Sequence, residues 1–235
     1  MSIAANLNAV RERIAAAARR AARSADDIAL MAVTKTFGPD DIRAAYDAGQ
    51  RLFGENRVQE LAGKFQAVRD LTDAGFHMIG HLQTNKAAKA VEVFSAVDSV
   101  DSVRLAEKLN AAAATTRKRL PILIELNLGG EESKTGVNPV SQEFGALLEA
   151  AARLDHLEFR GLMTIPPLTG DPQAARPYFR RLREIRDRIA ARNLPSIRLA
   201  TLSTGMSHDF EVAIEEGSTC VRLGTAIFGE LPRKA

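Results

Sequence analysis

Short apolar or β-branched runs alternate along the chain with segments of helical periodicity, and this alternation limits the possible folds more than any other feature. Between the runs, apolar residues recur at helical spacing, as Ile42, Ala45 and Tyr46 do. Strands that alternate with helices imply right-handed crossovers and a parallel sheet. Eight such runs are present, at residues 28–34, 51–54, 76–80, 93–99, 121–127, 157–163, 197–203 and 219–224.

Eight repeats in 235 residues predict an α/β fold in which residues 1–235 form a single (β/α)₈ TIM-type barrel domain. We expect an additional N-terminal helix with its apolar stripe on Ile3, Leu7 and Val10. No helix is expected after the eighth strand, so the N-terminal helix would cover that gap. Helices should begin at Pro39 and Pro139, because proline favours a first helical turn. An open, doubly wound sheet is the alternative fold.

The composition indicates a soluble, cytoplasmic protein. Its single cysteine, Cys220, excludes an internal disulfide and any site built from several cysteines. No apolar run approaches the roughly 18 residues needed to cross a bilayer, so no membrane partner is expected. The formal net charge is only +3. The basic segment Arg176–Arg192 is interleaved with Glu184 and Asp187, which is typical of a solvated helix face, and no nucleic-acid partner is expected.

Lys35 is the most specific feature at the carboxyl ends of the expected strands, where barrels of this type gather their chemistry. It follows six residues without charge, Ala29–Thr34. A lysine partly desolvated at the barrel mouth would be a usable amine nucleophile that forms a Schiff base with a carbonyl. The alternative is a lysine whose side chain simply reaches solvent.

The ends of the last two strands are rich in small and hydroxyl residues. Ser203, Gly205 and Ser207 follow the seventh strand, and Gly224 and Thr225 follow the eighth. Barrels of this class often bind phosphate with these two loops, through backbone N–H groups and a helix N-terminus. The alternative is that the glycines merely form turns.

Arg222 is expected to point into the barrel. Residues two apart in a strand share a face, so if Val221 and Leu223 pack against the outer helices, Arg222 faces inward. A guanidinium there is costly unless it is paired or binds a ligand, and Glu125 on the fifth strand is a candidate counter-ion. An amine, two phosphate loops and an inward arginine suit pyridoxal 5′-phosphate (PLP), which carries an aldehyde, a phosphate and a pyridine nitrogen.

The histidines do not suggest a metal site. His77 and His81 lie about 13 Å apart if they share one strand, and no acidic residue or cysteine is spaced to complete a site. No metal is therefore expected, and Cys220 is interpreted as a small core residue.

Several segments spread along the chain resemble the pyridoxal phosphate homeostasis proteins, whose fold is like the N-terminal barrel of bacterial alanine racemase. The last matching segment, which contains Gly205-Met206-Ser207, Asp209 and Val221-Arg222, is the most specific. The matching segments are residues 32–35, 53–60, 79–86, 131–136, 161–166 and 202–229.

The resemblance implies a role for eight residues toward PLP. Lys35 would form the Schiff base, and Arg222 would face the pyridine nitrogen. Ser203, Gly224 and Thr225 would hold the phosphate, while Asn56, Met163 and Met206 would border the ring. The chain departs from the family pattern at Phe37, where a lysine or other polar residue is expected, at Thr204, where methionine is commoner, and at Glu125, where a neutral amide is usual.

PLP racemases and decarboxylases share the resemblance, but they need a second acid/base group, usually from a second domain for which this length leaves no room. The two tyrosines, Tyr46 and Tyr178, fall in helical segments, and an arginine does not readily donate a proton to the ring. We therefore expect a monomeric, non-catalytic PLP carrier that buffers PLP and maintains PLP and amino-acid homeostasis. Apo PLP-dependent enzymes are the candidate recipients. The alternatives are a minimal PLP-dependent amino-acid racemase and a Schiff-base aldolase acting on a phosphorylated sugar through Lys35.

Overall fold

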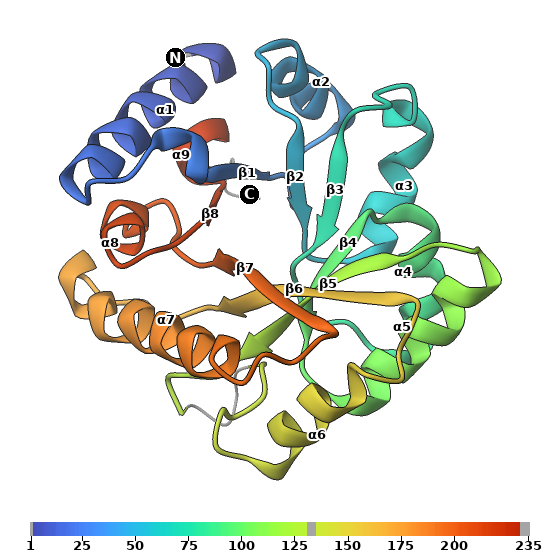
Figure 1. Ribbon diagram of the computed structural model, residues 1–235. Coiled ribbons are helices and arrows are strands. Elements are labelled where there is room, and N and C mark those ends of the chain that lie inside the picture. Colours follow the sequence, from blue (N-terminus) through green and yellow to red (C-terminus); the bar gives the residue numbers. More distant parts are fainter. Residues whose placement is uncertain (1, 131–134, 231–235) are drawn as a thin grey trace.

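The computed structural model describes residues 2–130 and 135–230, and its centre is a closed barrel of eight parallel strands in chain order (Figure 1). Strand β1 closes the barrel onto β8, with Met31 opposite Arg222. The expected (β/α)₈ barrel is confirmed, and the open sheet is wrong. Residues 131–134, part of one segment of the resemblance, lie outside the described residues. The strands are Ala29–Val33 (β1), Leu52–Glu55 (β2), Gly75–Met78 (β3), Ala96–Val100 (β4), Leu120–Leu126 (β5), Leu157–Thr164 (β6), Ile197–Ser203 (β7) and Cys220–Leu223 (β8).

The helices surround the barrel (Figure 1). They are Ile3–Arg20 (α1), Pro39–Asp47 (α2), Val58–Val68 (α3), Ala87–Val93 (α4), Val103–Thr115 (α5), Gln142–Ala150 (α6), Arg176–Ala190 (α7), Phe210–Glu215 (α8) and Thr225–Phe228 (α9), with 3₁₀ turns at Ala25–Asp27 (η1), Thr84–Lys86 (η2) and Pro172–Ala175 (η3). In the described part of the chain, no helix has both the length and the apolar character needed to span a membrane.

The N-terminal helix α1 is present as expected, but a short helix also follows the last strand. The expectation that nothing helical follows β8 is therefore wrong, because Gly224 starts the turn that becomes α9. Helix α1 lies beside α8 and α9 (Figure 1), and the Asn6 side-chain amide donates to the Ile227 carbonyl at 2.8 Å. Helices α1 and α9 are thus bonded to each other at the side of the barrel where its first and last strands pair.

Two helix boundaries show how local chemistry sets the element ends. Pro39 is the first residue of α2 as expected, and Gly49, just past its end, has φ +85°, a conformation that glycine adopts without strain. Pro139 does not begin α6. That helix begins three residues later, because the Ser141 hydroxyl accepts a hydrogen bond from the Phe144 N–H at 3.3 Å and caps the first turn.

The strands carry apolar side chains on both faces. The outward face packs against the helices and includes Phe53 and Leu223, while the inward cluster contains Met31, Val33, Ile79 and Cys220. This double burial is the usual pattern of parallel strands. It means that polar residues such as Arg222 occupy positions inside an otherwise apolar barrel.

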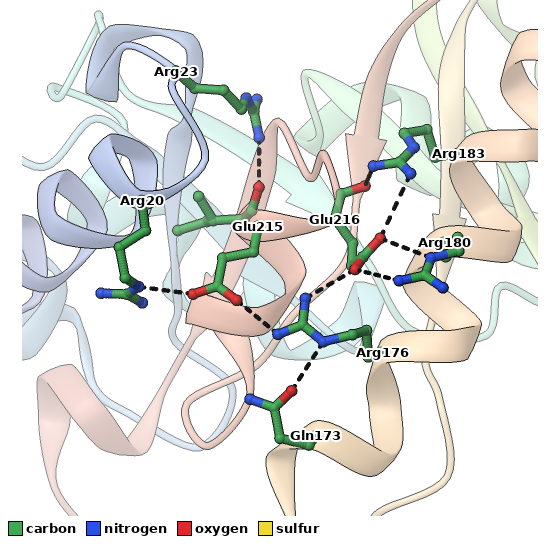
Figure 2. A network of polar contacts seen from close by, with 9 residues as sticks. Arg20, Arg23, Gln173, Arg176, Arg180, Arg183, Glu215 and Glu216 are labelled. Carbon is green, nitrogen blue, oxygen red and sulfur yellow. Dashed lines mark hydrogen bonds and ion pairs between the residues drawn. The ribbon is translucent and has the colours of Figure 1, made fainter.

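An ion-pair network holds α8 between α1 and α7 (Figure 2). The Glu216 carboxylate binds Arg176 at 2.8 Å and Arg180 at 3.1 Å, and Glu215 binds Arg20 at 2.8 Å and Arg176 at 2.7 Å. Burial opposes ionisation of Glu216, but the arginine hydrogen bonds outweigh it and lower the pKa of that carboxyl. The interpretation of Arg176–Arg192 as a plain solvated face is therefore wrong for its first half, which anchors α8.

Candidate functional site

Lys35 lies immediately after β1, at the carboxyl end of the barrel. Its side chain is exposed, and it makes no hydrogen bond or ion pair within the described residues. The expected partial desolvation is thus not observed, and the alternative, a lysine whose side chain reaches solvent, holds. The next residue, Thr36, has φ +68°. Lys35 is a free amine at the mouth of the barrel.

Arg222 points into the barrel, as the strand alternation predicts. Arg222 is 4% exposed, whereas Val221 and Leu223 pack in the outer, helix-facing layer. The guanidinium donates to the Ser203 hydroxyl at 2.8 Å and to the Thr164 carbonyl at 3.0 Å. Burial lowers the pKa of Arg222, while surrounding acidic groups oppose this shift. Arginine nevertheless stays protonated, so the barrel contains a permanent buried cation.

Glu125 also faces the barrel interior and is 2% exposed. Its Oε1 accepts a hydrogen bond from the Thr135 hydroxyl at 2.7 Å, and its Oε2 has no hydrogen-bond partner. Burial is the main cause that raises the pKa of Glu125. Its attraction to Arg222 acts only through space, since the direct partners of Arg222 are neutral oxygens. Glu125 thus acts as a counter-ion to Arg222 only at a distance, without a direct contact.

The loops after β7 and β8 lie side by side and are bonded to each other. The Arg222 N–H donates to the Gly205 carbonyl at 3.0 Å, and the Ala226 N–H donates to the Ser207 hydroxyl at 3.3 Å. Gly205 has φ +95°, and a Cβ there would lie 2.6 Å from the Ala213 Cβ. The two loops predicted to bind phosphate thus form one continuous, closely packed surface.

Gly224 connects this surface to the strand that leads to Lys35. A Cβ on Gly224 would lie 3.5 Å from the Val33 carbonyl oxygen, two residues before Lys35. Thr225, the next residue, is exposed at the mouth. Because β1 and β8 are neighbours in the barrel, the free amine and the loop after β8 belong to the same edge of the site.

Met163 and Met206 line the same end of the barrel, although Met206 is only half-buried. In strand register, fully buried Met163 lies between Glu125 of β5 and Ser203 of β7. Asn56 follows β2 and is half-buried. A Cβ on Gly80 would lie 2.3 Å from the Asn56 carbonyl oxygen, so the loops after β2 and β3 touch through that glycine.

Asp209, one of the residues of the most specific matching segment, is a buried carboxylate beside the loop after β7. It is 1% exposed, and its Oδ1 accepts a hydrogen bond from the Met206 N–H at 2.6 Å. Burial is the main cause that raises the pKa of Asp209. This bond ties the loop after β7 to the residue that precedes α8.

His77 has an acidic partner on β4, and His81 has one just after that strand. His77 Nδ1 lies 3.1 Å from Asp98, and His81 Nδ1 lies 3.6 Å from Asp101. Spacing along one strand cannot reveal such partners, because they lie about 20 residues further on. Within residues 2–130 and 135–230, no cluster of three or more histidine, cysteine or acidic residues could hold a metal. Cys220 is buried in the core as expected, and burial raises its pKa to about 12.

Comparison with known proteins gives consistent matches along the whole chain. Residues 5–232 match the family model for the alanine racemase N-terminal domain. The chain is 44% identical over 230 residues to the pyridoxal phosphate homeostasis protein of Aquifex aeolicus, covering 98% of this chain and 99% of that protein. It is 42% identical over 229 residues to the protein of the same name from Escherichia coli K12, covering 97% and 96%.

Solved structures agree with these matches. PipY of Synechococcus elongatus, solved with PLP bound, aligns with a TM-score of 0.85 at 36% identity, covering 97% of this chain and all of that chain. Alanine racemase from Streptomyces coelicolor aligns with a TM-score of 0.73 at 22% identity, covering 97% of this chain but 59% of that chain. The second likeness concerns the fold alone.

Proposed function

The chain belongs to the alanine racemase N-terminal-domain family, in which its full-length relatives are pyridoxal phosphate homeostasis proteins, and from this premise we propose that it binds, carries and buffers PLP. Lys35 would supply the amine that condenses with the PLP aldehyde, releasing one water and forming a Schiff base. The relative PipY, whose structure was solved with PLP bound, supports PLP as the ligand.

The observation that carries this proposal is the pairing of an exposed, unpartnered amine just after β1 with a buried cation on the neighbouring strand β8. PLP needs an amine, an anion-binding surface and a group that faces its pyridine nitrogen. Lys35, the packed loops after β7 and β8, and Arg222 supply these three types of group. The donor set therefore fits the cofactor.

Each remaining residue has a distinct task in the proposed complex. Ser203, Gly224 and Thr225 hold the phosphate, with close backbone approach at the glycine. Asn56, Met163 and Met206 border the ring. Arg222 keeps its own proton and faces the pyridine nitrogen as a donor, so the nitrogen stays unprotonated and the ring withdraws electrons weakly.

Weak electron withdrawal favours a carrier over an enzyme. Tyr46 and Tyr178 lie on the outer helices α2 and α7 and not on the strands that form the barrel, and the proposal gives neither an acid or base role. The proposal therefore assigns no catalytic residue. We further propose that the protein is cytoplasmic and monomeric. It would bind free PLP and pass it to apo PLP-dependent enzymes.

A minimal amino-acid racemase is the second candidate, and Glu125 is the observation that favours it. A buried carboxyl with a raised pKa inside the barrel has the character of a general acid/base. Racemisation of alanine by the wild type that disappears in Glu125→Gln would support this function. Equal background rates in both proteins would support the carrier.

The first experiment is the visible absorbance of the purified protein with PLP, followed by borohydride reduction and peptide mass spectrometry. We expect a yellow protein with one phosphopyridoxyl group on Lys35. Lys35→Ala should abolish the adduct, whereas Lys108→Ala, which removes an exposed lysine on α5, should not. A colourless wild type without adduct would refute the proposal and favour the sugar-phosphate aldolase.

A further inference from the structure

The backbone on both sides of Lys35 is held by one cluster of charged side chains, which we call the Lys35 clamp. It consists of Glu55, at the end of β2, with Glu60 and Lys64 on α3. Glu55 shares a strand face with Phe53, which packs in the helix-facing layer. The clamp therefore lies outside the barrel wall, and none of its bonds engages the amine of Lys35.

Lys64 holds the peptide that precedes Lys35. Its ammonium donates to the Thr34 carbonyl at 3.0 Å, to Glu55 Oε1 at 3.0 Å and to Glu60 Oε1 at 3.2 Å. An ammonium has three N–H donors, so these bonds use all of them. The Thr34 hydroxyl donates to the same Glu55 oxygen at 2.7 Å, which ties the end of β1 to the end of β2.

Glu60 holds the peptide that follows Lys35. Its Oε1 accepts a hydrogen bond from the Thr36 N–H, and the Thr36 hydroxyl donates to the Lys35 carbonyl. Thr36 has φ +68°, which is unfavourable for a β-branched residue. A residue keeps such a conformation only when its surroundings fix it, and the bond to Glu60 holds Thr36 from outside the turn, beside the local bond from the Phe37 N–H to the Thr34 carbonyl.

Forming the clamp also costs free energy of folding, because Glu55 is fully buried and its Oε2 has no hydrogen-bond partner. Burial raises the pKa of Glu55, although Thr34 and Lys64 oppose the shift. A purely stabilising contact would more simply use apolar side chains. The location of this charge at the turn that presents Lys35 indicates a role in presenting that residue.

We propose that Glu60 and Lys64 are positioning residues for Lys35, which hold its backbone so that the amine meets an aldehyde bound at the mouth. This inference rests on the proposed function. The amine condenses with the aldehyde and one water leaves, and the clamp takes no part in that exchange. Its effect is on the geometry of approach, to which such reactions are steeply sensitive.

Glu60→Ala is the most direct test, because Glu60 is partly exposed and its removal leaves Lys64 paired with Glu55. We expect the rate constant for adduct formation between PLP and Lys35 to fall about tenfold. Affinity for pyridoxine 5′-phosphate, which has an alcohol in place of the aldehyde, should stay within about twofold, because the hydrogen bonds of the clamp involve no residue of the loops after β7 and β8. Glu60→Gln keeps an acceptor for Thr36 and should restore most of the rate.

Two measurements separate positioning from a general loss of structure. Gln59→Ala, which removes an exposed neighbour on the same helix, should leave both values unchanged. In the protein without PLP, amide exchange at Thr36 should be faster in Glu60→Ala than in the wild type. Should the alanine variant not fold, Glu60→Asp keeps the charge and withdraws the carboxylate by one methylene.

The proposal is overturned if Glu60→Ala frees the Thr36 amide without slowing adduct formation, or if Gln59→Ala slows it equally. It is also overturned if affinity for pyridoxine 5′-phosphate falls as much as the rate does. Failure of the proposed function has a different signature, since the wild type itself would then form no adduct at Lys35.

Discussion

Replacing Arg222 with methionine tests whether the buried cation stabilises the barrel. The change removes hydrogen bonds to the Ser203 hydroxyl and the Thr164 carbonyl. It also removes the cation that attracts the buried carboxyls of Glu125 and Asp209. Removing one member of a buried charged group costs about 3–5 kcal/mol. At about 2–4 °C per kcal/mol for a chain of this size, the melting temperature should fall by roughly 6–20 °C.

The pH dependence of the stability loss in Arg222→Met shows whether the loss comes from the buried carboxyls of Glu125 and Asp209. Arg222 lowers the pKa of Glu125 and Asp209, so its removal raises both folded-state values further above those of the unfolded chain. A raised acid pKa means that the folded state binds more protons, and stability then falls as pH rises through that window. The deficit of Arg222→Met should therefore be larger at pH 8 than at pH 5.

Circular dichroism melts at both pH values provide the assay, with two comparison variants. Arg181→Met removes an exposed arginine of α7 and should change the melting temperature by less than about 2 °C. Arg222→Lys keeps the charge but cannot reproduce the forked geometry, so its deficit should be intermediate. If Arg222→Met melts within about 2 °C of the wild type at pH 8, the cation is not stabilising and this reasoning is refuted.

Three further changes test the site and its support. Gly205→Ala should cost about 2–5 kcal/mol, because φ +95° is strained for alanine and the new Cβ would meet the Ala213 Cβ; an unchanged denaturant midpoint would contradict this packing. Glu125→Gln should gain about 1 kcal/mol at pH 8 and less near pH 4.5, since the wild-type pKa is raised and the amide does not titrate. Melts across pH check this, with the exposed Glu149→Gln as control. Glu216→Gln should lower stability at pH 7 by about 1 kcal/mol, because its arginine partners are partly exposed. That loss should vanish as pH falls below about 4.5 through the lowered pKa, and a constant deficit would exclude the ion pairs as its cause.

The fold could be predicted because its signals are local. Strand and helix periods repeat eight times, and the closed barrel follows from the repetition. The inward direction of Arg222 followed from the two-residue alternation between Val221 and Leu223. The start of α6 was misplaced because Pro139 and Ser141 both favour a first turn, and the hydroxyl cap decides between them.

The lateral contacts could not be predicted, because strand neighbours are far apart in sequence. His77 meets Asp98, and Lys64 meets the Thr34 carbonyl, through the register of adjacent strands and the helix that follows. Local spacing contains no signal for these pairs. The sequence could not decide between a desolvated and an exposed Lys35 for the same reason, since one contact of the turn after it, from the Thr36 N–H to Glu60, joins residues 24 positions apart.

The distance between Arg222 and its acidic neighbours matters for the chemistry of the site. An inward arginine suggests a salt bridge, but this guanidinium is held by a hydroxyl and a carbonyl, and its carboxylate neighbours act at longer range. Neutral acceptors fix its direction without neutralising its charge at contact distance, and the two bonds use two of its five N–H donors. A carboxylate in contact would have occupied those donors. In the proposed complex, this arrangement leaves the arginine able to donate to a neutral ring nitrogen, which binds the cofactor while limiting the chemistry that it can perform.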